Sequence, residues 1–424
     1  MRRSSALSAY LMASRLAGPV AWPLLQMRKA RGKEDPGRLD ERLGRADRQR
    51  PEGRLIWLHG ASVGEAKSML PLIAALQMQS DAAILVTTGT VSSARQIGPA
   101  LPCGASHQYV PVDTNAAVSP FLDHWRPDLA IWVESEFWPR LIEATAHRKV
   151  PMALVNARVS AKSTKRWQRA PDMASILLSR FNMILAQDDE TRHRLSAFGV
   201  NARFGGNLKA LVDAPSCQLD QLQAMQAATQ GRPVWLAAST HPGEEELVLD
   251  AQTHVQERLP EALLILAPRH PERGDDLCRM MEERGINHAR HSTKAMPGPE
   301  TEVVLADTMG EMGLWYQLAP VTFVGGSLVP MGGHTPFEPA SLQTAILHGP
   351  HVDNFAPAYA AFGAAGGSRA IEGADDLGDA VVRLLSSVAE HRDMTRAATA
   401  AHDGLKPDVD GIAAELLILM EQGR

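Results

Sequence analysis

Short apolar runs rich in β-branched residues recur along the chain, and most lead into a polar or glycine-containing loop and then into a segment with helical spacing of its apolar positions. Unbroken apolar runs are typical of strands buried on both faces of a sheet. Strands that alternate with helices predict parallel sheets in an α/β fold. We expect strands at residues 55–58, 82–86, 108–111, 128–133, 152–155, 183–186, 233–238, 263–266, 302–305, 321–324 and 345–347.

The alternation pauses near residues 211–232, where a polar stretch around Pro215 precedes a glutamine-rich helical run. This break predicts two Rossmann-like domains, at residues 31–212 and 213–424, which suits a chain of 424 residues. Ligands of parallel sheets bind beyond the carboxyl ends of the strands. We therefore expect the two domains to face a central cleft that is lined by the loops following the strands.

Residues 1–30 form an apolar arm ahead of the first domain. Arg15, Gly18-Pro19 and Pro23 interrupt it, and its unbroken pieces are shorter than the about 20 residues that span a bilayer. A basic collar at residues 28–50 follows, with nine basic and five acidic side chains. This order predicts a helix that associates with an anionic cytoplasmic leaflet, since no clear cleavage site supports a signal peptide. The alternative is a core helix followed by a solvated basic helix.

The composition is that of a folded protein, with 45% hydrophobic and 21% charged residues. The net charge of −5 argues against a nucleic-acid partner. The three cysteines, Cys103, Cys217 and Cys278, are widely spaced and fit a reducing compartment better than a disulfide framework. Because Cys-x-x-Cys and His-Glu-x-x-His patterns do not occur, we expect neither a structural zinc site nor a metalloprotease site. We also expect no cofactor.

The stretch at residues 321–351 predicts a strand, a glycine-rich loop, a short helix and a second strand. Thr335 suits the N-cap of that helix and Pro336 its first position. Glycines let the backbone approach a ligand, and a helix N-terminus attracts anions, so the unit predicts a site for a phosphate or nucleotide. Glu338 in the first turn either accepts hydrogen bonds from ribose hydroxyls or only complements the helix dipole. The glycine pairs also fit ordinary turns.

Several charged residues follow predicted strands in the first domain. Glu65 lies where the loop after the first strand enters a helix, and it is either a general base or a helix-end acid. Glu134 and Glu136, which lie on one side if their strand continues, favour a site over a purely structural role. Lys209 follows a double glycine and is either a stabiliser of negative charge or a surface lysine.

Two further segments contain basic residues that are candidates for binding an acidic group. Arg269 follows a predicted strand in the second domain, where it is well placed to meet a phosphate or carboxylate. Residues 160–169 are basic and contain Trp167. This segment either meets an acidic acceptor or is a solvated face, and the sequence does not separate the two interpretations.

An ordered set of motifs runs through most of residues 38–360 and resembles the 3-deoxy-D-manno-octulosonic acid (Kdo) transferases of lipopolysaccharide synthesis. Each motif alone is weak, but the set in this order is specific. The apolar arm is also similar to the membrane anchor of that family. The matching stretches are HGASVGE (59–65), ESEFWPRL (134–141), VNARVS (155–160), GGNLK (205–209), STHPGEE (239–245), APRHPER (267–273), DTMGEM (307–312) and VGGSLVPMGGHTPFEPA (324–340).

The resemblance implies a GT-B glycosyltransferase fold, with the acceptor bound by the N-terminal domain and the donor by the C-terminal one. It implies inverting transfer of Kdo from CMP-Kdo to a lipid A precursor of the lipid IVA type, at the cytoplasmic face of the inner membrane. By similarity, Glu65 is the general base, and Glu134 and Lys209 stabilise the transition state. The positions that match the CMP-binding segments are Pro268, Arg269, Met309, Gly310, Glu311, Thr335, Pro336, Phe337 and Glu338.

This chain departs from the family pattern at two of those positions, because the family usually has Asn in place of Thr335 and Leu in place of Phe337. Threonine still caps a helix, so we expect CMP binding with altered cytidine contacts. One rival interpretation is another GT-B enzyme, such as a nucleotide-sugar epimerase or a transferase with a UDP donor. A second is a non-catalytic nucleotide-binding protein at the membrane, against which Glu65, Glu134 and Lys209 speak.

Overall fold

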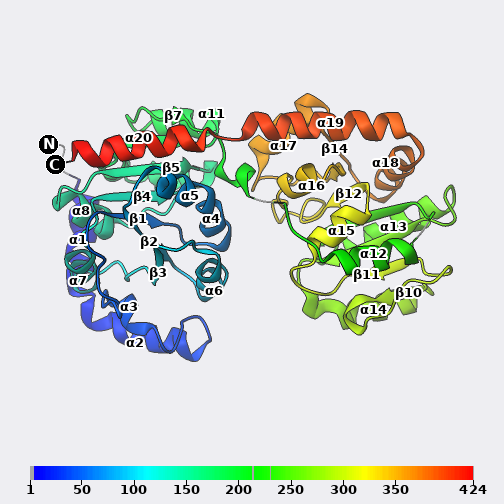
Figure 1. The fold of residues 1–424 in the computed structure, drawn as a ribbon, viewed down its shortest axis with the longest axis horizontal. Coiled ribbons are helices and arrows are strands. Elements are labelled where there is room, and N and C mark those ends of the chain that lie inside the picture. The colour runs from blue at the N-terminus through cyan, green and yellow to red at the C-terminus, as the bar shows by residue number, and fades with distance from the viewer. Residues whose placement is uncertain (1–3, 213, 230, 424) are drawn as a thin grey trace. The chain divides into compact units, whose positions relative to one another are not determined.

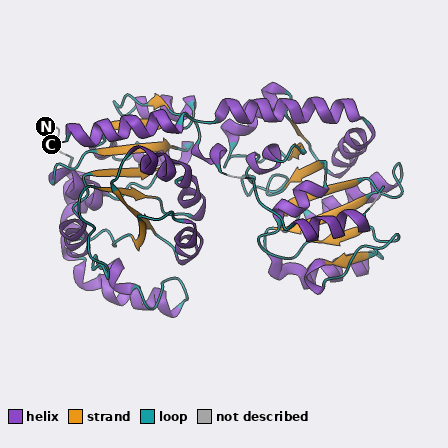
Figure 2. Ribbon diagram, in the orientation of Figure 1, coloured by secondary structure: helices purple, strands orange, loops and turns teal. Residues whose placement is uncertain are grey.

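The computed structural model describes residues 4–212, 214–229 and 231–423, and the chain forms two compact units (Figure 1). Unit 1 comprises Met1–Val212 together with Lys406–Arg424, and unit 2 comprises Asp213–Leu405. Each unit has a parallel sheet with helices on both faces, as the alternation of strands and helices predicts (Figure 2).

The sheet of unit 1 has seven parallel strands in the order β3-β2-β1-β4-β5-β6-β7. The order reverses between β1 and β4, which are neighbours in the sheet although two other strands separate them in the sequence. The carboxyl end of such a reversal is where open α/β sheets bind their ligands. The strands are β1 Leu55–His59, β2 Ala83–Thr88, β3 Ala105–Tyr109, β4 Leu129–Val133, β5 Met152–Ala157, β6 Met183–Ala186 and β7 Arg203–Phe204.

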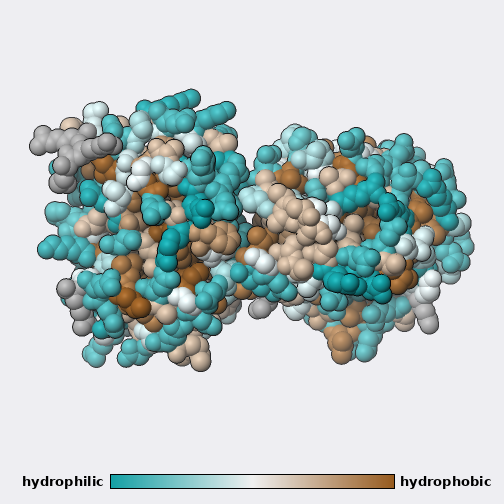
Figure 3. Space-filling model, turned by 90° about the horizontal axis from the view of Figure 1, so that it is seen from above, coloured by the Kyte–Doolittle hydropathy of each residue, from teal (hydrophilic) through white to brown (hydrophobic). Residues whose placement is uncertain are grey.

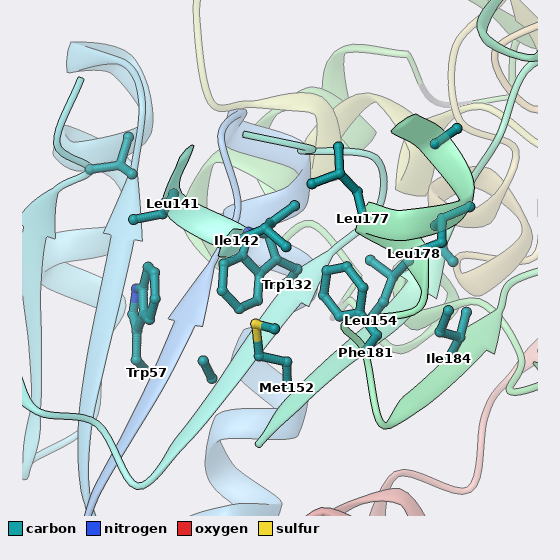
Figure 4. Packing of buried hydrophobic residues seen from close by; sticks show 14 of the residues in the cluster. Trp57, Trp132, Leu141, Ile142, Met152, Leu154, Leu177, Leu178, Phe181 and Ile184 are labelled. Atoms are coloured by element: carbon teal, nitrogen blue, oxygen red, sulfur yellow. The ribbon is translucent and has the colours of Figure 1, made fainter. Parts of the chain in front are cut away.

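Alternate residues of these strands face two separate cores. Trp57 of β1 and Trp132 of β4 pack edge to face with ring centroids 4.9 Å apart on one side of the sheet (Figure 4). Their neighbours Ile56 and Ile131 point to the other side.

The face in Figure 3 is mainly hydrophilic, with hydrophobic residues exposed only in small groups. The helices of unit 1 are α1 Ser5–Leu16, α2 Gly18–Ala30, α3 Leu39–Arg42, α4 Val63–Ser68, α5 Leu70–Gln79, α6 Val91–Ile97, α7 Asn115–Trp125, α8 Pro139–His147, α9 Ala161–Trp167, α10 Pro171–Leu178, α11 Asp189–Ser196 and α20 Val409–Gln422.

The last helix corrects the predicted domain limits. The boundary after residue 212 agrees with the structure, but residues 406–424 belong to unit 1 and not to the second domain. Ile412, Leu416 and Met420 of α20 share a core with Leu72 and Leu76 of α5. The physical reason is that an apolar helix face fits either sheet, so its sequence does not reveal which sheet it covers.

Unit 2 repeats the architecture with seven parallel strands in the order β10-β11-β9-β8-β12-β13-β14, and its reversal lies between β8 and β12. The strands are β8 Val234–Thr240, β9 Leu263–Pro268, β10 His288–Arg290, β11 Val303–Leu305, β12 Val321–Val324, β13 Ala345–His348 and β14 Ser368–Ala370. The helices are α12 Leu219–Ala228, α13 Glu245–Gln256, α14 Gly274–Glu283, α15 Met312–Leu318, α16 Phe337–Ser341, α17 Ala356–Ala365, α18 Ala374–Ser386 and α19 Val388–Leu405.

All the predicted strands are present, and β6 and β12 have the predicted limits. The strand predicted at residues 108–111 lies earlier, at Ala105–Tyr109, because its first residues are polar and only partly buried. The sequence missed β7, β10 and β14. Each of these is short, lies in the outermost position of its sheet and is rich in polar residues, so none has an apolar run to mark it.

The N-terminal arm consists of two helices, α1 and α2, that meet at Ala17. Helix α1 is held against the rest of unit 1, since the Tyr10 hydroxyl donates to Asp113 (2.7 Å) and Arg140 Nε donates to Ser14 Oγ (2.8 Å). No helix in the described part of the chain has the length and apolar character needed to cross a membrane. The described residues of the arm nevertheless expose several large apolar side chains, including Met12, Leu16, Val20, Trp22, Leu24 and Met27.

Much of the basic collar is internal structure. Arg28 and Arg42 both contact the buried carboxylate of Glu34, at 2.6 and 3.3 Å, and Arg38 contacts the buried Glu41 at 2.7 Å. Less of the collar's positive charge therefore faces solvent than its composition suggests.

Candidate active site

Glu65 lies at the reversal point of the unit 1 sheet, in the first turn of α4 just beyond the end of β1. Ser62 caps this helix by accepting a hydrogen bond from the Glu65 backbone N–H at 3.3 Å. The Glu65 carboxylate turns back and accepts hydrogen bonds from the Ala61 N–H and the Ser62 hydroxyl, each at 2.8 Å. This arrangement is similar to a capping box, except that the carboxylate accepts from the N–H of Ala61, one residue before the N-cap Ser62, so Glu65 does serve the helix end.

The surroundings of Glu65 also give it the properties of a base. Burial, together with the nearby charges of Glu134 and Glu136, raises the pKa of its carboxyl group to about 7, although the hydrogen bonds from Ser62 and Ala61 oppose the rise. A carboxyl group with a pKa near neutral is ionised often enough to accept a proton and basic enough to hold it. The two interpretations made from the sequence are therefore compatible.

Glu134 follows β4, the strand on the other side of the reversal point. Its carboxylate is buried and lies 2.6 Å from the ammonium group of Lys209. Lys209 Cε stands 3.9 Å from where a side chain on Gly64 would begin, so the lysine also reaches the helix that carries Glu65. The structure thus brings together the three residues that the sequence nominated separately.

Two residues at this point hold an unusual backbone conformation. Glu134 and Asn156, at the ends of the neighbouring strands β4 and β5, have φ values of +62° and +55°. Asn156 Oδ1 accepts a hydrogen bond from the Leu208 N–H at 3.1 Å, which fixes the backbone next to Lys209. Left-handed conformations in non-glycine residues cost free energy and concentrate at functional sites, where surrounding contacts hold them.

Glu136 does not share a strand face with Glu134, because β4 ends at Val133 and the backbone turns at Glu134. The Glu136 carboxylate accepts a hydrogen bond from Trp138 Nε1 at 2.9 Å. Burial raises its pKa, and the charge of Glu134 adds to the rise. Glu136 therefore belongs to the same acidic group, but through a turn and not through strand periodicity.

In unit 2 the loop after β12 differs from the predicted phosphate cradle. The buried carboxylate of Glu244 accepts hydrogen bonds from the backbone N–H groups of Gly326, Ser327 and Leu328 at 2.6, 2.9 and 2.8 Å. It also accepts one from the His241 N–H at 3.0 Å. The amide groups that the glycine pair was expected to offer to a phosphate are therefore already bonded within the protein.

A histidine pair that the sequence did not nominate stands at the reversal point of unit 2. His241, after β8, and His334, after β12, stack with ring planes 8° apart and with their Nε2 atoms at 2.9 Å. Burial lowers the pKa of His334 to about 4 and also lowers that of His241, and Arg269 contributes to both shifts. The available signal was that both histidines lie in loops that follow predicted strands, at residues 233–238 and 321–324.

The predicted CMP-binding residues all lie at the carboxyl edge of the unit 2 sheet. Pro268 is the last residue of β9, and Arg269 follows it. The loop after β11 carries Met309, which is exposed, Gly310, with φ +87°, and Glu311. Glu311 lies 3.1 Å from His291 Nε2.

The segment before α16 differs slightly from the prediction. The helix begins at Phe337 with Pro336 as N-cap, one residue later than expected, and Thr335 Oγ accepts from the Phe337 N–H at 3.3 Å. The Phe337 side chain is 3% exposed and packs against His402 and Phe362, so only its backbone is available to a ligand. Glu338 lies in the first turn of α16. Burial raises the pKa of the Tyr316 phenol, and the charge of Glu338 adds to the rise.

Two Rossmann-like units, each with a seven-stranded parallel sheet, have the architecture of the GT-B fold of glycosyltransferases. Residues 37–212 match the family model described as "3-Deoxy-D-manno-octulosonic-acid transferase (kdotransferase)". The 3-deoxy-D-manno-octulosonic acid transferase of Bordetella pertussis is 35% identical over 93% of this chain and 96% of the relative. The chain therefore belongs to the Kdo transferase family.

Other relatives extend this result. A probable mitochondrial 3-deoxy-D-manno-octulosonic acid transferase of Arabidopsis thaliana is 36% identical over 78% of this chain and 76% of the relative. A glycosyltransferase from Rickettsia africae covers 88% of this chain and 99% of its own length, with a TM-score of 0.60 and 10% identity. At that identity the last likeness concerns the fold alone.

Proposed function

We propose that this protein transfers Kdo from CMP-Kdo to a hydroxyl group of a lipid A precursor of the lipid IVA type, with inversion at the anomeric carbon. The observation that carries the proposal is the placement of Glu65 at the reversal point of unit 1, with a pKa of about 7 and beside the Lys209–Glu134 ion pair. Membership of the Kdo transferase family favours this donor over the UDP-sugar alternatives.

Glu65 acts as the general base in this reaction. Its carboxylate takes the proton of the acceptor hydroxyl as the oxygen forms a bond to the anomeric carbon of Kdo, and the bond from that carbon to the phosphate oxygen of CMP breaks. The electron pair of the broken bond leaves with CMP. Lys209, held at 2.6 Å by Glu134, supplies positive charge where negative charge develops in the transition state.

Unit 2 is proposed to hold CMP. Arg269, the loop at residues 309–311 and the segment at 335–338 lie along one edge of the sheet and offer a cation, backbone groups and the Glu338 carboxylate. Arg269 can receive the charge of the departing CMP, so the proposed reaction needs no metal ion. His241 and His334, which share one hydrogen bond between two ring nitrogens, are the additional donor-site candidates.

The arm is proposed to place the enzyme on the cytoplasmic face of the inner membrane. The exposed apolar side chains on α1 and α2, with Lys33 and Arg31 exposed just beyond them, suit a helix pair that lies in the headgroup region of anionic lipids. Tyr10 and Ser14 tie α1 to unit 1, so the arm would fix that unit at the membrane surface.

The test is a radiolabel transfer assay with purified protein, CMP-Kdo made in situ, a tetra-acylated lipid A precursor in detergent, and EDTA. Labelled lipid is the expected product, and Glu65→Gln is expected to reduce transfer at least about a hundredfold while CMP binding by calorimetry stays unchanged. Product that requires magnesium would remove the metal-free mechanism. Tight UDP binding without CMP binding would support a different GT-B enzyme, and CMP binding without any transfer would support the non-catalytic alternative.

A further inference from the structure

Unit 1 contains an apolar cavity with a basic rim that the proposed chemistry does not use. Helices α8, α9 and α10 and the turn before α8 enclose about 250 Å³. Arg166 lines both this cavity and an adjoining depression of about 630 Å³. The cavity is lined chiefly by Phe137, Pro139, Trp167, Met173, Leu177 and Leu178. The depression is lined by Lys162, Ser163, Lys165, Arg166 and Arg169.

The walls of the cavity are firmly packed. Trp167 stands edge to face with Phe137, at 4.8 Å between ring centroids, and with Phe198 at 5.5 Å. Leu177 and Leu178 are buried in the same core. The cavity is therefore built by the fold, and an alkyl segment that entered it would leave water without a rearrangement of the protein.

The cations at the rim lack the partners that arginines have elsewhere in this unit. In the ranges that the structure describes, Lys162, Lys165, Arg166 and Arg169 make no ion pair with a carboxylate, and all four side chains are exposed. By contrast, Arg180, just beyond α10, is held by Glu143 at 2.7 Å. Unpaired cations beside an apolar opening complement a ligand that joins a phosphate to an alkyl chain.

The cavity also lies close to the catalytic group along the chain. Phe137 is three residues from Glu134, and three residues of extended backbone span at most about 10 Å. A lipid that places one chain in the cavity and a phosphate on the rim would thus have its sugar headgroup near the Glu134–Lys209 pair.

We propose that this cavity binds one acyl chain of the acceptor lipid and that the basic rim, with Arg166 at its centre, binds the adjacent phosphate. The proposal rests on the proposed transferase function for the identity of the lipid. The proposed ligand is the acceptor lipid and not the bulk phospholipid of the membrane, although both join a phosphate to alkyl chains. The cavity would then select acylated, phosphorylated acceptors over the bare sugar.

The first experiment measures binding of decyl phosphate, below its micelle concentration, to the full chain by calorimetry. The leucine side chain of Ala170→Leu projects into the cavity and displaces part of the alkyl chain. Each methylene left in water weakens binding about fourfold, so that displacing two predicts a loss of about fifteenfold. Arg166→Gln is expected to weaken the binding of decyl phosphate by about tenfold and to leave the binding of decyl glucoside unchanged. Arg192→Gln, an exposed arginine paired with Asp189, is the matched control and should bind both probes like the wild type. Circular dichroism and CMP binding check that each variant is folded.

The second experiment measures KM for tetra-acylated, deacylated and dephosphorylated acceptors, together with binding to phosphatidylglycerol vesicles. Ala170→Leu should raise KM for the acceptors that carry acyl chains and not for the deacylated one. Arg166→Gln should raise KM for the acceptors that carry phosphate and not for the dephosphorylated one. In both variants kcat should stay nearly unchanged. Vesicle binding should not change in either variant, and an equal loss there would assign the site to membrane lipid and overturn the proposal.

The two proposals fail separately. If the wild-type protein does not bind decyl phosphate, or if Ala170→Leu and Arg166→Gln bind it as the wild type does, the cavity assignment is overturned even when Kdo transfer is observed. Absence of Kdo transfer would overturn the proposed function, and the decyl phosphate measurement would still decide what the cavity binds.

Discussion

Glu65 is expected to titrate near neutral pH, so kcat/KM for transfer should rise with pH and level off above pH 7. With a pKa of about 7, roughly one tenth of Glu65 is ionised at pH 6 and roughly nine tenths at pH 8. Only the ionised form takes a proton from the acceptor, so kcat/KM should fall about tenfold for each pH unit below the midpoint. An unperturbed glutamate would give a flat profile across the same range.

Two substitutions should move this midpoint in opposite directions. Glu134→Gln removes a charge that raises the Glu65 pKa and leaves the positive charge of Lys209 nearby, so the midpoint should fall. Ser62→Ala removes a hydrogen bond that lowers the pKa, so the midpoint should rise. The height of the plateau is expected to drop in both variants, since Glu134 supports Lys209 and Ser62 caps α4. The position of the midpoint is therefore the informative quantity.

The raised pKa of Glu65 also predicts how the stability of the fold depends on pH. The folded protein holds a proton on Glu65 that the unfolded chain releases between pH 4.5 and about 7, so this residue makes the fold less stable as pH rises through that window. A shift from 4.5 to about 7 corresponds to at most about 3 kcal/mol. Glu65→Gln should therefore gain up to that amount relative to the wild type between pH 5 and pH 8, in urea unfolding followed by circular dichroism.

A profile of kcat/KM that is flat from pH 5.5 to 8 would refute the reasoning, provided that acceptor and donor remain below saturation. Midpoints that shift in the same direction in Glu134→Gln and Ser62→Ala would refute the electrostatic account while leaving Glu65 as a base. An unchanged stability difference between Glu65→Gln and the wild type at the two pH values would show that folding does not raise the pKa of this carboxyl group.

Two further substitutions test the contacts around each reversal point. Lys209→Met leaves the buried Glu134 carboxylate unpaired and should cost about 3 kcal/mol in urea unfolding, whereas the double variant with Glu134→Gln should lose less than the sum of the single losses. Glu244→Gln turns an N–H group toward backbone donors and should cost about 3 kcal/mol, with weaker CMP binding by calorimetry; retained stability would show that the loop does not depend on this carboxylate.

The sequence predicted the sheets well because central parallel strands are buried on both faces and carry unbroken apolar runs, as in β4 and β8. It failed where the physical signal is not local. Strand β14, Ser368–Ala370, has only one neighbouring strand and one buried residue, so pairing with β13 and not its own pattern creates it. Helix α20 covers unit 1 because of contacts with α5, more than three hundred residues earlier in the chain.

The candidate site was predicted as separate residues, and the structure supplied their relations. Glu134 and Lys209 were each nominated, but only the fold shows that they form an ion pair at 2.6 Å. His241 and His334 were not nominated, because a histidine after a strand is uninformative until a second ring is seen against it. Trp167 and its basic neighbours were identified, but the cavity beneath them depends on α8 and α10 as well.

Glu65 and Glu244 show why the local pattern alone could not separate a catalytic acid from a structural one. Each glutamate directly follows a glycine, Glu65 in HGASVGE and Glu244 in STHPGEE. Each also lies in the segment that follows a strand bordering the reversal point of its sheet, β1 for Glu65 and β8 for Glu244. A carboxylate offers about four lone-pair positions. Four backbone N–H groups occupy those of Glu244, whose carboxylate is therefore saturated and holds the loop after β12. Among the residues that the structure describes, Glu65 accepts from Ala61 and Ser62 only, with one bond on each oxygen, so each oxygen keeps a position that can receive the proton of an incoming hydroxyl.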